Sequence, residues 1–132
     1  MHHLGMQFAH MLKPNSVVSF FGELGAGKTT FIKGLAHGFG IDPNSVNSPT
    51  FQYLNVYNGS PSIFHFDLYR LENSDDFLTM GFEELFGKEG ITCIEWAERI
   101  TTILPHNCIH ISITHIENGK RQVKIKELEA IA

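Results

Sequence analysis

The sequence has few cysteines and lacks the clustered pattern of a Cys/His metal site. It contains only two cysteines, Cys93 and Cys108. Each lies within an apolar, strand-like run, and the two lack the spacing of a metal site. The eight histidines are scattered and form neither an HExxH motif nor a Cys/His cluster. We therefore expect two reduced thiols in the core, no disulfide framework, and no metal site built from histidine.

Long apolar runs and an excess of positive charge are also missing. No segment approaches the roughly 20 apolar residues of a membrane span. The first 15 residues, MHHLGMQFAHMLKPN, lack the charged leader and apolar segment of a secretory signal. The formal net charge of −4 provides no basic surface for broad nucleic-acid binding. We expect a cytoplasmic protein whose partners include neither DNA nor a membrane.

The apolar patterns predict strands mixed with helices. VVSFF (17–21) and GITCIEW (90–96) are short, β-branched or aromatic runs typical of buried strands. Apolar residues recur at helical spacing over residues 28–39, and Gly40 ends that run. Short helices are expected over 75–86, interrupted near Gly81, and over 97–105, ending at a proline.

Two Asn-Gly pairs predict antiparallel hairpins. NGSP separates alternating runs at 51–57 and 62–69, and ENGK separates runs at 108–116 and 121–128. Hairpins force antiparallel neighbours, so an all-parallel sheet is not expected. Residues 1–132 therefore predict a single α/β domain, with a mixed parallel/antiparallel sheet flanked by helices.

Residues 22–29, GELGAGKT, match the phosphate-binding pattern G-x-x-x-x-G-K-[ST] of P-loop NTPases. Glycines let successive backbone N–H groups point at phosphate oxygens, and the following helix N-terminus favours anions. The lysine can reach the β- and γ-phosphates of a nucleotide, and the threonine hydroxyl can bind Mg²⁺. The predicted nucleotide-binding residues are Gly22, Glu23, Leu24, Gly25, Ala26, Gly27, Lys28, Thr29 and Thr30.

Two acids follow apolar strands, as an acidic Mg²⁺ partner should: Asp67 after IFHF and Glu95 after ITCI. Either could orient the attacking water. Our preferred interpretation puts Glu95 with Thr29 on the metal, and Asp67 on metal-bound water or the nucleophile. Thr50, in a proline-containing loop, is a candidate for sensing the γ-phosphate. Trp96, the only tryptophan, fits a core residue or a ligand platform.

These motifs occur in the order GELGAGKTT, SPTF (48–51), HFDLYRL (65–71) and IEWAE (94–98). Together they resemble the TsaE family, the small ATPases of bacterial tRNA threonylcarbamoyladenosine (t⁶A) biosynthesis. The resemblance covers residues 4–128. Two mild departures are Ala97, where the family often has proline, and Glu23, where it commonly has aspartate.

The resemblance implies ATP and Mg²⁺ as cofactors and slow ATP hydrolysis. It also implies association with the TsaB–TsaD pair, in which TsaD transfers the threonylcarbamoyl group to adenosine 37 of tRNA, so that tRNA is met only through that complex. By matching motifs, Asp67 and Glu95 would surround Mg²⁺ and water, and Thr50 would act as a switch residue. Trp96 would lie close to the nucleotide.

Three other functions fit a phosphate loop. A small-molecule kinase needs an acceptor pocket and usually a lid with several arginines, whereas Arg70, Arg99 and Arg121 are dispersed. A GTPase needs a guanine-reading N-K-x-D segment, which this sequence lacks. A binding module would use nucleotide only as an assembly signal, and the sequence does not exclude it.

Overall fold

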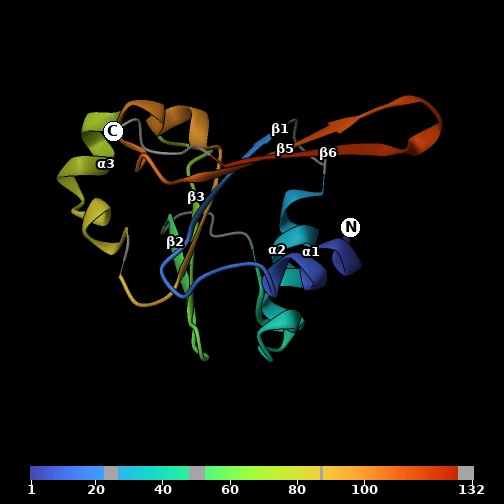
Figure 1. The fold of residues 1–132 in the computed structure, drawn as a ribbon. Helices are drawn as coiled ribbons and strands as arrows, with labels where there is room; N and C mark the ends of the chain where they lie inside the picture. Colours follow the sequence, from blue (N-terminus) through green and yellow to red (C-terminus); the bar gives the residue numbers. More distant parts are fainter. Residues whose placement is uncertain (23–26, 48–52, 87, 128–132) are drawn as a thin grey trace.

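The computed structural model describes residues 1–22, 27–47, 53–86 and 88–127. Six strands form one sheet in the order β2-β3-β4-β1-β5-β6 (Figure 1). The helices and strands, with η marking 3₁₀ segments, are α1 His2–Ala9, β1 Val17–Gly22, α2 Lys28–Gly38, η1 Pro43–Ser45, β2 Leu54–Tyr57, β3 Ile63–Asp67, α3 Ser74–Thr79, η2 Phe82–Leu85, β4 Ile91–Glu95, η3 Ala97–Ile103, β5 Ile109–His115, η4 Glu117–Gly119 and β6 Arg121–Glu127.

The four central strands, β3, β4, β1 and β5, run parallel, and each edge strand is antiparallel to its neighbour. Both hairpins that the Asn-Gly pairs predict are therefore confirmed. Asn118 and Gly119, in the turn between β5 and β6, both have positive φ, 65° and 72°, which asparagine and glycine tolerate. The mixed sheet of the predicted α/β domain is confirmed as well.

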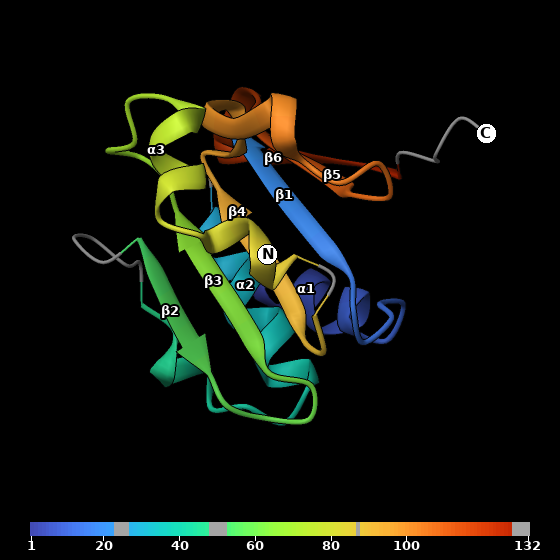
Figure 2. The same ribbon diagram turned by 90° about the vertical axis from the view of Figure 1, so that its left-hand side faces the viewer.

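Helices cover both faces of the sheet (Figures 1 and 2). On one face, α1 and α2 pack against a core that includes Val18, Phe20, Phe31 and Ile111. On the other, α3, η2 and η3 cover a second core built around Phe66 and Phe77. Because a strand covered on both faces buries successive side chains, β1 and β4 are nearly continuous apolar runs.

Several details differ from the sequence prediction. The segment after β4 is a 3₁₀ helix over Ala97–Ile103, with a non-helical break at Ile100. The helix α1 was not predicted, since it is only eight residues long and histidine and glycine interrupt its apolar residues. The predicted interruption of the helices near Gly81 is confirmed. Cys93 and Cys108 are buried and form no disulfide, as expected.

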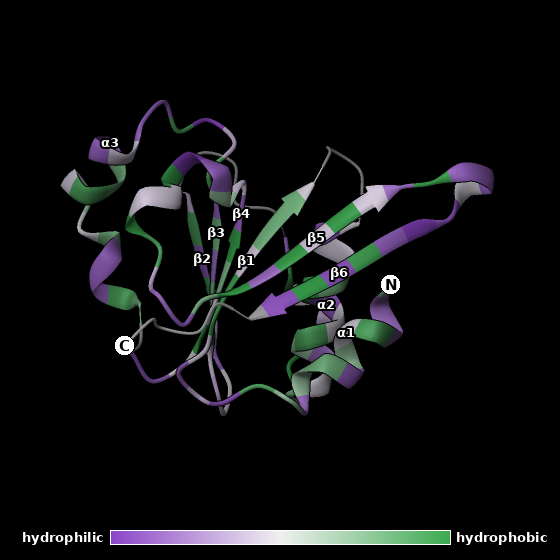
Figure 3. Cartoon of the chain, turned by 45° about the horizontal axis from the view of Figure 1, so that its top comes forward, coloured by the Kyte–Doolittle hydropathy of each residue, from purple (hydrophilic) through white to green (hydrophobic). Residues whose placement is uncertain are grey.

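Hydropathy follows this arrangement (Figure 3). Apolar residues concentrate in the central strands, while the far end of the β5–β6 hairpin is hydrophilic. No helix within the described ranges combines the length and apolarity needed to cross a bilayer.

Helix α1 packs against α2 at glycine positions. A Cβ atom added at Gly34 would lie 2.0 Å from the carbonyl oxygen of His2 and 3.0 Å from the Cα of Gly5. A Cβ at Gly5 would in turn lie 2.3 Å from the carbonyl oxygen of Phe31. The two helices can approach this closely only because neither position carries a side chain.

We expect Gly34→Ala to lower the free energy of unfolding by about 2 kcal/mol, because the added methyl group must push α1 away. Alanine's better helix propensity, about 1 kcal/mol relative to glycine, offsets only part of this cost. Chemical denaturation should measure the change, with Lys33→Ala on the same helix as control. A Gly34→Ala variant as stable as its parent would contradict the close packing of α1.

Candidate functional site

The candidate phosphate loop joins β1 to α2, as the sequence predicts for a strand–loop–helix motif. Its ends, Gly22 and Gly27, have φ angles of 141° and 104°. A Cβ at Gly22 would also lie 2.2 Å from the carbonyl oxygen of Ile113, so only glycine fits there. The predicted residues Glu23, Leu24, Gly25 and Ala26 lie outside the described residues, as does Thr50.

Lys28 occupies the first position of α2 and is 4% exposed. Its Nζ donates a hydrogen bond to the carbonyl oxygen of Gly22 at 3.1 Å. The same atom lies 4.2 Å from the centre of the Trp96 ring, where the negative ring face attracts a cation. An ammonium group has three N–H donors, so this lysine can also bind a phosphate oxygen.

Strand register brings the two acids together. Asp67 ends β3 and pairs with Glu95, which ends β4, and Glu95 also pairs with Phe20 of β1. All three positions therefore lie at the carboxyl end of the sheet, next to the start of α2. The Thr29 hydroxyl donates to Oε1 of Glu95 at 3.2 Å. The pairing of Thr29 with Glu95 is thus present in the structure.

Asp67 is half-buried, and its Oδ1 accepts a hydrogen bond from the backbone N–H of Tyr69 at 3.0 Å. Burial raises the pKa of Asp67 above its usual value, and the neighbouring Glu95 raises it further. A raised pKa means that the folded state binds a proton more readily than the unfolded state. Ionisation of Asp67 therefore costs folding stability, and the cost appears as pH rises through its pKa.

We expect Asp67→Asn to raise the melting temperature of the nucleotide-free protein by a few degrees at pH 7. Asparagine keeps the acceptor for Tyr69 but removes the buried charge beside Glu95. The gain should shrink as pH falls through the raised pKa of Asp67 and vanish below the usual aspartate pKa, because Asp67 is then neutral in both states. Thermal unfolding at neutral and acid pH measures this. A lower melting temperature at pH 7 would contradict the pKa shift.

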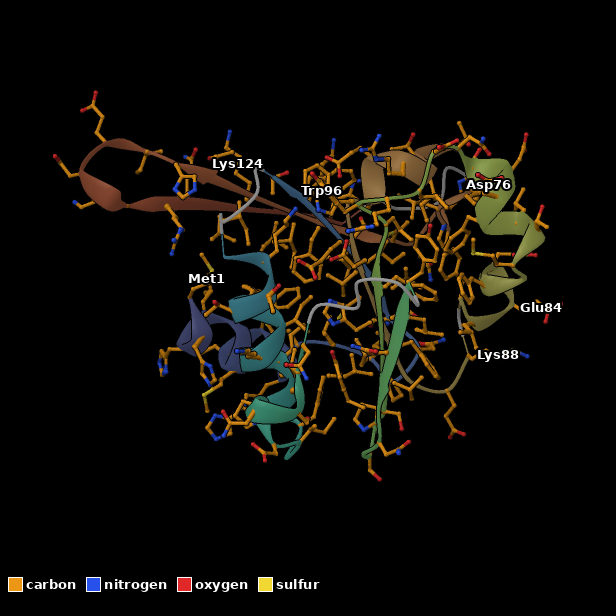
Figure 4. All side chains as sticks on the ribbon, turned by 180° about the vertical axis from the view of Figure 1, so that it is seen from behind. Met1, Asp76, Glu84, Lys88, Trp96 and Lys124 are labelled. Carbon is orange, nitrogen blue, oxygen red and sulfur yellow. The ribbon has the colours of Figure 1, made fainter. Side chains whose placement is uncertain are left out.

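Trp96 lies at the end of the sheet that carries η3 (Figure 4). Its backbone adopts the left-handed conformation, with φ of 60°, which is uncommon for a bulky residue and frequent at functional sites. Its ring centre is 5.1 Å from that of Tyr69, and the guanidinium of Arg99 lies 6.0 Å away. The structure thus places Trp96 beside Lys28 rather than deep in the core.

Two side chains of the site were missed at the sequence level. His65 is fully buried on β3, and its Nε2 lies 2.6 Å from Oε2 of Glu95. Tyr57, on β2, holds the other ring nitrogen of His65 at 2.8 Å. The alternation of β3 was the available signal, because His65 lies two residues before Asp67 and so shares its face.

Thr30 and Arg70 follow Thr29 and Asp67 in the sequence, and both are exposed. Thr30 lies on α2, one residue beyond Thr29. Arg70 lies three residues beyond Asp67. The predicted role of Thr30 in nucleotide binding rests on the sequence pattern.

The residues present suit Mg²⁺. Thr29, Glu95 and Asp67 supply hydroxyl and carboxylate oxygens, which this hard cation prefers. Across the described part of the chain, no three His, Cys, Asp or Glu side chains gather into a metal-binding group. Two carboxylates and a hydroxyl are typical ligands of Mg²⁺ in nucleotide enzymes, where the ion is held by one or two carboxylates together with substrate phosphates.

Comparisons with known proteins agree with this geometry. Residues 1–123 match the family model described as "Threonylcarbamoyl adenosine biosynthesis protein TsaE". A curated TsaE of Treponema pallidum is 40% identical over 121 residues, covering 92% of this chain and 89% of the relative. A TsaE of Bacillus subtilis is 40% identical over 116 residues, covering 87% and 72%.

A solved structure is similar as well. The crystal structure of YdiB from Bacillus subtilis superposes with a TM-score of 0.79 at 30% sequence identity. The match covers 97% of this chain and 78% of the solved one. The shared fold therefore extends over nearly the whole of this chain.

Proposed function

This chain belongs to the TsaE family of threonylcarbamoyl adenosine biosynthesis proteins, and we propose that it binds ATP with Mg²⁺ and hydrolyses it slowly. Family membership supports a role in making the t⁶A modification of tRNA. The observation that carries the ATPase proposal is the meeting of Lys28, Thr29 and Glu95 at one end of the sheet.

In this proposal the loop of residues 22–30 holds the phosphates. Backbone N–H groups at the start of α2 face the nucleotide, since the N-terminus of a helix favours anions. Lys28 adds a positive charge and is held in place by Gly22 and Trp96. Phosphoryl transfer to water depends mainly on positioning and charge neutralisation, and these groups provide both.

Thr29 and Glu95 would hold Mg²⁺, and Asp67 would act on a bound water. Mg²⁺ supplies charge neutralisation on the phosphate oxygens when it is bound. Glu95 is almost fully buried, so its orientation is set by protein contacts rather than by solvent. Asp67 is adjacent to Glu95 and half-buried, and its raised pKa means that it accepts a proton more readily than an ordinary aspartate. The carboxylate of Asp67 is therefore suited to orient a water molecule or to accept a proton from it.

We further propose that the ATP cycle acts on the TsaB–TsaD complex, and that this chain meets tRNA only through it. The transfer of the threonylcarbamoyl group would remain with TsaD. As tRNA modification takes place in the bacterial cytoplasm, we assign this chain to that compartment. In this proposal residues 1–132 form one domain with a single nucleotide site. The remaining exposed surface is then available for contact with the partner complex.

Phosphate release from Mg·ATP tests this proposal, first with the chain alone and then with the TsaB–TsaD pair added. We expect a low rate that rises when the pair is added. A rate that the pair leaves unchanged would keep the ATPase but remove the proposed partner. Consumption of ATP without phosphate release would instead indicate a kinase.

A further inference from the structure

A chain of hydrogen bonds leads from the β2 side of the sheet to the candidate Mg²⁺ ligands. The Tyr57 hydroxyl oxygen accepts from the backbone N–H of Asn47 at 3.1 Å and lies 2.8 Å from the Asn47 carbonyl oxygen. Its single hydrogen is donated to Nδ1 of His65, 2.8 Å away, when Nε2 carries the ring hydrogen. Nε2 of His65 contacts Oε2 of Glu95 at 2.6 Å. Oε1 of Glu95 then accepts from Thr29 at 3.2 Å.

The direction of the central hydrogen bond follows from its chemistry. A carboxylate can only accept, so Nε2 of His65 carries the hydrogen that points at Oε2 of Glu95. Both oxygens of Glu95 are thereby held, one by the imidazole and one by the Thr29 hydroxyl. Rotation of the carboxylate would break both bonds at once.

Burial makes this arrangement strong. His65 is 0% exposed and Glu95 is 4% exposed. A buried carboxylate is costly unless its oxygens have donors, and a hydrogen bond to a charged group is strengthened where water is excluded. Tyr57, also buried, keeps the imidazole from turning by occupying its other nitrogen.

We propose that His65 is a positioning residue, held by Tyr57, that fixes Glu95 with Oε1 turned toward Thr29 and the Mg²⁺ position. This inference rests on the proposed function. The imidazole takes one oxygen of Glu95 and leaves the other for the metal side. Side chains that orient a metal ligand in this way typically change metal affinity or activity by about 10- to 100-fold when they are replaced.

Three variants separate this role from simple core packing. His65→Leu removes both hydrogen bonds of the ring. His65→Gln keeps an N–H donor that can reach Glu95, and Tyr57→Phe removes only the hydroxyl that orients the ring. His115→Leu, at an exposed position of β5, is the matched control. Circular dichroism and thermal unfolding establish that each variant is folded.

The measurement is the Mg²⁺ concentration that half-saturates ATP binding, with ATP affinity in EDTA measured alongside. His65→Leu should need about 10- to 100-fold more Mg²⁺ while its affinity in EDTA stays near that of the parent. His65→Gln should recover most of the loss, and Tyr57→Phe should show a smaller increase. If His65→Leu does not fold, Tyr57→Phe still carries the test.

A second readout needs no nucleotide. Nitrogen-15 NMR of the parent chain should show that Nε2 of His65 carries a hydrogen, and its absence would overturn the pairing with Glu95. A parent without Mg²⁺-dependent ATP binding would overturn the proposed function and this inference with it. A parent that shows such binding, beside folded His65→Leu and Tyr57→Phe variants with an unchanged Mg²⁺ requirement, would overturn this inference alone.

Discussion

The Lys28→Ala variant is expected to bind ATP about 100-fold more weakly than the parent chain, because hydrogen bonds to a charged group contribute about 1.5–3 kcal/mol. Lys28 is the cation at the start of α2, and it is held there by the carbonyl of Gly22 and the ring of Trp96. Removing it leaves the phosphates with backbone N–H donors only. Isothermal titration calorimetry with Mg·ATP measures the loss.

Two further variants make this result interpretable. Lys28→Met keeps most of the apolar side chain against Trp96 but removes the charge, so it should bind as weakly as Lys28→Ala. Lys33→Ala removes a positive charge from the same helix and should bind like the parent. Trp96, the only tryptophan, also offers a fluorescence signal beside the site. ATP affinity in Lys28→Ala equal to that of the parent would remove the phosphate-cradle assignment.

Glu95→Gln is expected to bind ATP with an affinity within a few-fold of that of the parent. It should release phosphate at least about 100-fold more slowly. Glutamine has nearly the same shape, and its oxygen can still accept from Thr29. The variant loses the negative charge that the proposal requires at the metal and the water. A phosphate-release assay at saturating Mg·ATP measures the change in turnover.

Glu98→Gln, at an exposed position three residues away on η3, is the matched control and should leave turnover unchanged. Comparison with Asp67→Asn assigns the two acids. If Glu95 binds the metal, Glu95→Gln should need more Mg²⁺ for turnover. If Asp67 acts on the water, Asp67→Asn should turn over slowly at the same Mg²⁺ requirement as the parent. Parent-like turnover in both variants would exclude both acids from the mechanism.

The same variants bear on the binding-module alternative. If Glu95→Gln binds ATP, hydrolyses almost none, and still supports many rounds of tRNA modification with TsaB and TsaD, then nucleotide binding alone is the function. If modification stops after the first rounds, hydrolysis is required to reuse the complex. Multi-round modification assays with excess tRNA distinguish these outcomes.

Local chemistry was enough to predict most of the fold. Asn118 and Gly119 favour the turn between β5 and β6 because both adopt positive φ at little cost. The strands β1 and β4 are recognisable because burial on both faces requires continuous apolar residues. Helix α1 was missed because it is short, and because its packing depends on close contact at Gly5 and Gly34, a tertiary effect that its own sequence does not reveal.

The sequence by itself also identified the chemical groups of the candidate site. The glycines, Lys28 and Thr29 match a local phosphate-loop pattern, and each of the two acids ends an apolar strand. Only the tertiary structure decided how these groups meet. Strand register sets Asp67 beside Glu95, and the packing of α2 brings Thr29 to the same carboxylate. The fixing of Glu95 by His65 joins residues 30 positions apart, and such a contact depends on which strands are neighbours in the sheet rather than on any local pattern.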